Sequence, residues 1–320
     1  MKRRCIVVGC GWAGVQHAQT VHDSEVAQLT AVVEPNAQRA LQMKERFGVQ
    51  VYASLEDALE RADFDTAVVA TLPNLHARQC RLLLEHGKDV LCEKPLCPSK
   101  DEIAQLMDVA RAHGVQLGVV FNQRYGCAVQ RAKALLEEDT SPRQLITASM
   151  YQNFHVLRGE HIGEMFLLTD SCCHLLDLMT YLVGPVAEGR AIGNRDERGV
   201  YVNVAATLRF AGGCVGTMAH SAYGGELETQ HPFQQIEIHT QRARYVIDSL
   251  VDRLTVYPHA NERREIYEPS VFERRDYGHT MTLACRNFLQ ALYRREPVPV
   301  PAQDAWLNAA AIETLCASII

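Results

Sequence analysis

Hydrophobic residues in the first 120 positions gather in short apolar runs, separated by longer stretches with helical periodicity. Such short runs, with no polar alternation, are typical of strands buried on both faces of a parallel sheet. Strands that alternate with helices predict an α/β fold with an N-terminal doubly wound parallel sheet. The expected strands are residues 5–8, 29–33, 49–52, 66–70, 90–92 and 116–120, and the expected helices include residues 15–21, 55–61, 75–86 and 100–113.

The pattern changes after Tyr125, where a helix at residues 128–138 leads into segments of alternating hydrophobicity. This alternation predicts a large, open, mostly antiparallel sheet with helices on one face and the other face available for a partner. We therefore expect one α/β domain at residues 1–121 and a second at residues 122–320, whose C-terminal helices can pack back on the first. The expected strands here are residues 144–151, 201–210, 214–222, 235–239, 243–248 and 254–257, and the C-terminal helices are residues 280–294 and 303–318.

Charge and cysteine content exclude several classes of protein. The net charge of the 320 residues is -6, without a basic stripe, so we expect no nucleic-acid partner. The 11 cysteines are odd in number and show no C-x-x-C spacing, which favours a reduced, cytoplasmic chain over a disulfide framework. The first apolar run is too short for a signal peptide, and no run approaches the ~18 apolar residues of a membrane span.

A glycine-rich loop, Gly9-x-Gly11-x-x-Gly14, follows the first expected strand and opens a helix. The first glycine allows a tight turn, the second lets the backbone approach a pyrophosphate, and the third lets helix and strand pack closely. Glu34 ends the next strand, twenty positions after Gly14, where a carboxylate binds the ribose 2′-hydroxyl of NAD. NAD is therefore favoured; Arg39 could turn toward a 2′-phosphate, which leaves NADP as the alternative.

Polar residues also end the later strands, at the sheet edge where ligands bind in open α/β folds. Lys94 is the most notable, because Pro95 restrains it toward an extended conformation and an ammonium in a partly dry crevice can hydrogen-bond a substrate oxygen. The structural alternative for Lys94 is a surface lysine that pairs with Glu93. The structural alternative for Asn74 is a helix N-cap. The residues expected to line the cofactor crevice are Gly9, Gly11, Trp12, Ala13, Gly14, Glu34, Thr71, Leu72, Pro73, Asn74, His76, Glu93, Lys94 and Asn122.

A second group of polar residues lies in the expected helix that follows residue 168 and ends at Gly184 and Pro185. Asp170, His174 and Asp177 share one face at i, i+4 and i+7, on a helix that is otherwise largely apolar. A histidine flanked by carboxylates can accept an alcohol proton, although a capping Asp170 and a core His174 are the structural alternative. Cys172 and Cys173 face other sides of the helix than His174, so we expect no metal site.

Taken in order, these motifs resemble the glucose-fructose oxidoreductase / inositol dehydrogenase / rhizopine catabolism (Gfo/Idh/MocA) family over essentially the whole chain. They are Gly9-x-Gly11-x-x-Gly14, Thr71-x-Pro73-Asn74-x-His76, Glu93-Lys94-Pro95 and Asp170-x-x-x-His174-x-x-Asp177. The resemblance implies an N-terminal NAD(P)-binding Rossmann domain at residues 1–121 and a substrate-binding and oligomerisation α/β domain at residues 122–320, which forms a homodimer or homotetramer through its sheet. The implied activity is NAD(P)-dependent oxidation or reduction of a secondary alcohol of a sugar, amino sugar or cyclitol. The resemblance also implies that Lys94 binds the reacting oxygen, that His174 is the acid/base and that Asp170 assists it.

The sequence leaves the substrate and two other functions open. Many family members carry glycines where this chain has residues 166–169 and 171–173, so the shape of its pocket is not given by the resemblance. An NAD-dependent glycoside hydrolase and a non-catalytic NAD(P) sensor share the fold, although sensors often lose the lysine or the histidine. The expected substrate contacts are Lys94, Arg124, Tyr125, His155, Asp170 and His174.

Overall fold

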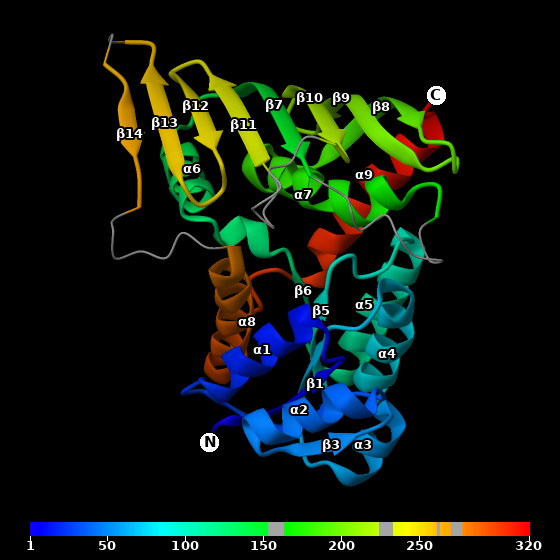
Figure 1. Cartoon of the computed structure of the whole chain (residues 1–320). Coiled ribbons are helices and arrows are strands. Elements are labelled where there is room, and N and C mark those ends of the chain that lie inside the picture. The colour runs from blue at the N-terminus through cyan, green and yellow to red at the C-terminus, as the bar shows by residue number, and fades with distance from the viewer. Residues whose placement is uncertain (153–162, 224–232, 261–262, 270–276) are drawn as a thin grey trace. The chain divides into compact units, whose positions relative to one another are not determined.

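Two compact units make up the chain in the computed structural model (Figure 1), which describes residues 1–152, 163–223, 233–260, 263–269 and 277–320. The first unit contains Met1–Asn122 and Met281–Trp306, and the second contains Gln123–Thr280 and Leu307–Ile320. All but the first turn of α8 (Tyr277–Arg294) and the start of α9 (Ala302–Ser318) thus belong to the unit that contains the N-terminus.

The first unit is built on a 6-stranded sheet in the order β3-β2-β1-β4-β5-β6, in which every pair is parallel. Its central strands are almost entirely buried, as the short apolar runs predict. The predicted doubly wound parallel sheet is therefore confirmed. The strands are β1 (Arg3–Val8), β2 (Ala27–Val33), β3 (Gln50–Tyr52), β4 (Thr66–Val69), β5 (Asp89–Glu93) and β6 (Leu117–Val120).

Helices connect these strands, and the start of one of them differs from the sequence-based expectation. Ser99 caps α5 through its side chain and Gly114 ends it in the left-handed conformation, as expected. Asn74 is not an N-cap: Leu72 is, and Pro73 takes the first helical position, where its missing N–H costs nothing. The helices are α1 (Trp12–His22), α2 (Ala37–Phe47), α3 (Leu55–Arg61), α4 (Pro73–Glu85), α5 (Lys100–His113) and α8 (Tyr277–Arg294).

An 8-stranded sheet forms the second unit, in the order β14-β13-β12-β11-β7-β10-β9-β8 (Figure 1). All pairs are antiparallel except β7 with β10, which confirms the mostly antiparallel sheet. The sequence-based prediction missed β8 and β14, which end the sheet on its two sides; β8 is rich in glycine and charged residues, so it shows little apolar alternation. The strands are β7 (Arg143–Tyr151), β8 (Val186–Arg195), β9 (Tyr201–Phe210), β10 (Val215–Ser221), β11 (Phe233–Thr240), β12 (Ala243–Asp248), β13 (Arg253–Pro258) and β14 (Glu265–Tyr267).

Helices cover one face of this sheet, where α6 (Cys127–Glu138), α7 (Cys172–Val183) and the end of α9 (Ala302–Ser318) form an apolar core with the strands. A π-helical turn, Leu167–Ser171, precedes α7. The capping role considered for Asp170 as the structural alternative is therefore wrong, since α7 begins after Ser171 without a side-chain cap. Among the described residues, no helix combines the length and apolar character needed to cross a membrane.

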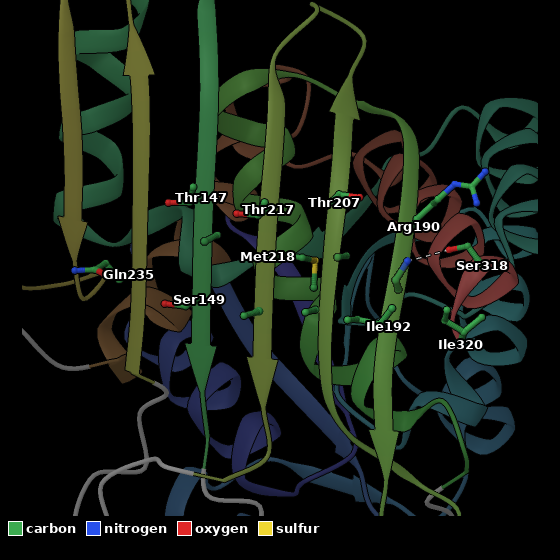
Figure 2. Close-up of a pocket in the computed structure, with 15 residues that line it drawn as sticks. Thr147, Ser149, Arg190, Ile192, Thr207, Thr217, Met218, Gln235, Ser318 and Ile320 are labelled. Carbon is green, nitrogen blue, oxygen red and sulfur yellow. Dashed lines mark hydrogen bonds between the residues drawn. The ribbon is translucent and has the colours of Figure 1, made fainter.

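In the described part of the second unit no helix covers the opposite face of the sheet, and many of the side chains that line this face are small (Figure 2). Along β7, β9 and β10, exposed or half-buried positions alternate with the core positions, as in a sheet with one free face. These side chains line a shallow hollow of about 640 Å³. We call this surface the outer face; its centre is formed by Thr147, Ser149, Ala205, Thr207, Thr217 and Ala219.

Candidate active site

The glycine-rich loop uses its three glycines in different ways. A Cβ on Gly9, whose φ is +90°, would lie 2.7 Å from the carbonyl oxygen of Ala70, and a Cβ on Gly14 would lie 1.9 Å from that of Gly9. Both glycines therefore allow close contacts inside the first unit. A Cβ on Gly11 would meet nothing within 4 Å among the described residues. Gly11 thus leaves open space directly before α1.

The N-terminus of α1 is suited to an anion. Gly11 is its N-cap and has no side chain to bind the first backbone amides, and the first turn carries no acidic residue. These amides and the helix dipole favour a phosphate group. Together with the space beside Gly11, the loop fits the pyrophosphate of a dinucleotide.

Glu34 directly follows β2 and is fixed by the backbone around it. Its Oε2 accepts a hydrogen bond from the Cys10 amide (2.9 Å), and its Oε1 accepts one from the Asn36 amide (2.9 Å). Arg39 donates to Oε1 over 3.2 Å, and only 3% of the Glu34 side chain is exposed. This arrangement ties the carboxylate to the glycine-rich loop, where it can bind a ribose diol.

A cleft of about 200 Å³ adjoins the loop in the same unit. Gly9, Val33 and Pro35 line one part of it, while Thr71 and Leu75 line another. Its apolar walls beside the Glu34 strand suit an adenine ring. The residues of the first unit therefore fit an adenine dinucleotide.

The different surroundings of Gly11 and Gly14 predict different effects of adding one methyl group. Gly14→Ala should lower the free energy of unfolding by ~1–3 kcal/mol, because its Cβ would clash with backbone. Gly11→Ala should leave the unfolding midpoint near that of the wild type and weaken NAD binding at least ~10-fold, because the new methyl would occupy the pyrophosphate space. Denaturant unfolding and titration with NADH distinguish the two variants. Equal loss of stability in Gly11→Ala and Gly14→Ala would contradict the different roles assigned to these glycines.

Replacing Glu34 should change the cofactor preference. We expect Glu34→Ala to weaken NAD binding ~10-fold or more, because the ribose hydroxyls lose a charged acceptor. NADP binding should improve, because a 2′-phosphate then meets Arg39 without the carboxylate. Titrations of both cofactors check this, with Arg39→Ala as the matched variant that should weaken only NADP. An unchanged NAD-to-NADP ratio in Glu34→Ala would exclude this role.

Lys94 follows the last residue of β5, and two buried histidines hold the residues beside it. Nε2 of His17, on α1, donates to Oε1 of Glu93 over 2.8 Å. Nδ1 of His76, on α4, donates to the carbonyl oxygen of Pro95 over 2.8 Å. His17 and His76 are both fully buried. The turn that carries Lys94 is therefore fixed on both sides.

His76 was expected to line the cofactor crevice, and the structure gives it another position. The residue is fully buried, and its Nε2 lies 3.2 Å from the Thr71 carbonyl oxygen. Burial lowers the pKa of His76, so the ring stays neutral at neutral pH. The one proton of the neutral ring is then on Nδ1 and binds the turn at Lys94, while Nε2 packs against the end of β4 without a hydrogen bond to it. Trp12 and Leu72, which were also expected to line the cofactor crevice, are by contrast 56% and 54% exposed.

In the second unit, His174 lies in the first turn of α7 and is 8% exposed. Asp170 lies in the π-helical turn before it and is half-buried. A π-helical turn is wider than an α-helical turn and often occurs at functional sites. The sequence suggested that Asp170 and His174 lie on one regular α-helix. In the structure Asp170 lies in the π-helical turn and only His174 lies in α7.

A buried network next to His174 fixes the start of α7. His220, on β10, has Nδ1 3.0 Å from Sγ of Cys172 and Nε2 3.3 Å from Oγ of Ser171. Burial lowers the pKa of His220 to about 3 and raises that of the Cys172 thiol. Because Ser171 donates to Gln152, the hydroxyl can accept from a neutral His220 protonated on Nε2. The pair is thus a neutral structural contact, without a reactive thiolate.

Asp177, the third polar residue of the α7 motif, pairs with Arg124. The guanidinium donates through Nε (2.8 Å) and Nη2 (2.6 Å) to the two carboxylate oxygens, and both residues are buried. Arg124 also lies over the ring of Tyr181, 4.9 Å from its centroid. The pair joins the turn Asn122–Tyr125 to α7, so Arg124, an expected substrate contact, is bound within the second unit.

The remaining expected residues differ in how far the structure describes them. Asn122 is buried, and burial raises the pKa of the half-buried Tyr125 to about 12. His155 lies outside the described residues. Within the described ranges, no three His, Cys, Asp or Glu side chains are grouped so as to hold a metal ion.

The sequence analysis did not identify His17 as part of the site. Its place on the buried face of α1, with Gly14, Ala18 and Val21, could have revealed it.

Comparison with known protein families agrees with the two units. Residues 3–121 match the model of an oxidoreductase family with an NAD-binding Rossmann fold, and residues 130–246 match the GFO/IDH/MocA C-terminal domain. The chain belongs to the GFO/IDH/MocA oxidoreductase family. Its membership confirms the resemblance seen in the motifs and the NAD-binding domain predicted from the glycine-rich loop.

Curated relatives of this family member include two named for inositol oxidation. The inositol 2-dehydrogenase of Leifsonia xyli subsp. xyli is 32% identical over 187 residues, which cover 57% of this chain and 54% of that protein. The scyllo-inositol 2-dehydrogenase (NADP(+)) of Bacillus subtilis (strain 168) is 31% identical over 186 residues, or 57% and 56% of the two chains. The chain thus matches about half the length of these relatives.

Solved structures share the fold over the whole chain. An oxidoreductase from Agrobacterium radiobacter, in complex with NAD+, L-tartaric acid and magnesium, is 19% identical with a TM-score of 0.89 and covers 99% of this chain and 96% of its own. A levoglucosan dehydrogenase, in complex with NADH and levoglucosan, is 19% identical with a TM-score of 0.87 over 99% and 97%. At this identity the likeness establishes the architecture.

Proposed function

We propose that this protein is an NAD-dependent dehydrogenase that transfers a hydride between the nicotinamide cofactor and a secondary alcohol or ketone of a cyclitol or sugar. The observation that carries the proposal is the dinucleotide site of the first unit: an open α1 N-terminus beside Gly11, with the Glu34 carboxylate fixed next to it. The family model and the inositol dehydrogenases among the relatives support the oxidoreductase activity and the substrate class.

The bound cofactor would supply the hydride acceptor or donor, while the side chains of the chain manage the oxygen and its proton. We assign Lys94 to the reacting oxygen, where its ammonium stabilises negative charge that develops as the hydroxyl is oxidised. We assign His174 to the proton, which its imidazole accepts in oxidation and returns in reduction. Asp170 assists by favouring the protonated imidazole.

NAD is the proposed physiological cofactor, because the buried Glu34 carboxylate would repel a 2′-phosphate. The Glu34–Arg39 contact (3.2 Å) engages the guanidinium that a 2′-phosphate would need. The NADP(+) relative shows that members of the family can differ in this choice.

Absorbance at 340 nm tests the activity. Purified protein is mixed with NAD or NADP and a panel of inositol stereoisomers, free hexoses, amino sugars, levoglucosan and nucleotide-linked sugars. We expect NADH to form with one of these classes and faster than NADPH. If NADH binds tightly but no alcohol or ketone in the panel changes its absorbance, and an aryl glycoside is cleaved instead, the dehydrogenase assignment is wrong.

We also propose that the outer face of the eight-stranded sheet packs against a second copy of this chain. The support is its cover of threonine, serine and alanine side chains, which are small enough for a flat sheet to approach closely. Light scattering should then give a multiple of the 35.8 kDa chain mass. Thr217→Arg should reduce it to one chain mass, whereas Arg253→Ala, on β13, should not. A monomeric wild type would exclude this proposal.

A further inference from the structure

A glutamine whose side chain is held by a neighbour lines the cleft that fits the adenine ring. Gln79 lies on α4 and is half-buried, on the wall of the cleft of about 200 Å³ that Thr71 and Leu75 also line. Oγ1 of Thr71, just after β4, donates to Oε1 of Gln79 over 2.6 Å. The carboxamide oxygen of Gln79 is therefore engaged within the first unit, and the direction of the hydrogen bond is fixed because this oxygen can only accept.

The amide nitrogen of Gln79 keeps its N–H donors for a ligand. Among the residues that the structure describes, it has no hydrogen-bond partner. Other polar side chains of the cleft are engaged with each other or with backbone: Ser54 caps α3 through its hydroxyl, and Glu56 accepts from Arg78 over 3.1 Å. Turning the carboxamide around would leave the proton of the Thr71 hydroxyl without its acceptor. The Thr71 contact thus leaves a donor, and not an acceptor, as the part of Gln79 that a ligand of the cleft can use.

We infer that Gln79 selects adenine as the base of the dinucleotide, with its amide donating to N1 of the ring. The strand order β2-β1-β4 places Glu34, after β2, and α4, after β4, on opposite sides of β1. A ribose bound at Glu34 therefore presents the far edge of its base, with N1 and the 6-amino group, to α4. N1 of adenine accepts a hydrogen bond, whereas N1 of hypoxanthine or guanine carries a hydrogen and would leave the amide unpaired. The inference rests on the dinucleotide site of the proposed function and adds the residue that selects its base.

Binding of two reduced dinucleotides tests the inference without any alcohol substrate. Calorimetric titration gives the Kd of NADH and of reduced nicotinamide hypoxanthine dinucleotide, in which a 6-oxo group replaces the amino group and N1 carries a hydrogen. We expect the wild type to bind NADH at least ~10-fold more tightly, because N1–H of hypoxanthine and the amide of Gln79 would both be donors. Gln79→Leu should weaken NADH binding at least ~5-fold and reduce the preference between the two dinucleotides to within ~2-fold.

Gln79→Glu separates hydrogen bonding to the base from simple packing. Its carboxylate has nearly the same shape but only accepts, so it should bind N1–H of hypoxanthine and reverse the preference in favour of the hypoxanthine dinucleotide. A purely structural role of Gln79 predicts equal losses for both dinucleotides. Because this variant keeps the shape of the side chain, it also tests the inference if Gln79→Leu does not fold. Gln105→Leu, on α5, is the matched control: Gln105 accepts from Arg81 at the surface and does not line the cleft, so both affinities should stay those of the wild type.

Two results would overturn the inference: a wild type that binds both dinucleotides equally, or a preference for NADH that persists in the folded Gln79 variants. If NADH itself does not bind, the proposed function and the inference fail together. If NADH binds with the expected preference but no alcohol in the panel is oxidised, the proposed function fails and the role of Gln79 stands. If an alcohol is oxidised but the two dinucleotides bind alike, the reverse holds.

Discussion

Lys94→Ala is expected to lower turnover at least ~100-fold while the affinity for NADH changes little. The variant removes the ammonium that we assign to the reacting oxygen, and the glycine-rich loop and Glu34 are left as they are. The fall should therefore appear in kcat at saturating substrate and cofactor. Stopped-flow or steady-state absorbance gives kcat, and titration of protein fluorescence with NADH gives the affinity.

Lys88→Ala is the matched control, because it removes a lysine of the same unit that donates to the backbone carbonyl of Phe64, two residues before β4. It should keep kcat within a few-fold of the wild type. Lys94→Arg is also informative, since its planar guanidinium keeps the positive charge but differs in shape. It should recover only part of the activity. Wild-type-like turnover in Lys94→Ala would remove Lys94 from the reaction.

His174→Ala is expected to have an effect of similar size, at least ~100-fold on kcat, because the hydroxyl proton loses its acceptor. The loss should be smaller at high pH, where hydroxide or a water molecule can take the proton. The Lys94→Ala/His174→Ala double variant should be little slower than either single one, since groups that act in one step are not additive. Steady-state rates between pH 6 and 10 give all three comparisons.

Two histidines of the second unit serve as controls for this variant. His239→Ala removes a half-buried ring that pairs with Glu237 on the same strand, and it should leave kcat unchanged. His220→Ala disturbs the contact with Cys172 at the start of α7, so it should lower stability as well as rate. A His174→Ala variant that turns over as fast as His239→Ala would exclude the acid/base role.

The fold could be predicted from the sequence because its strands are either continuously apolar or regularly alternating. Residues 66–69 and 90–92 show the first pattern and β9 shows the second, so both sheets were expected. β8 could not be recognised, since an edge strand with one exposed face tolerates glycine, asparagine and arginine. Its pairing with β9 is decided by tertiary contacts that no local pattern shows.

The cofactor loop could also be predicted from the sequence, because each glycine has a steric reason at a fixed spacing. The side-chain contacts that support the candidate site could not be predicted in this way. His17 and Glu93 are 76 residues apart, and Arg124 and Asp177 are 53 apart, so only the folded chain brings each pair together. Likewise, the sequence placed Asp170 and Asp177 on one helical face. In the structure Asp170 lies in the π-helical turn before α7, whereas Asp177 lies in α7 and pairs with Arg124.

Transfer of deuterium tests the central claim, hydride exchange with a secondary alcohol, most directly. Once the absorbance panel has identified an alcohol, the same compound with deuterium on its ring carbons is incubated with protein and NAD, and the isolated NADH is examined by mass spectrometry and proton NMR. The account predicts one deuterium per NADH, at C4 of the nicotinamide, and one ketone per NADH. Deuterium that returns to the sugar or is lost to water, without net NADH, would contradict it.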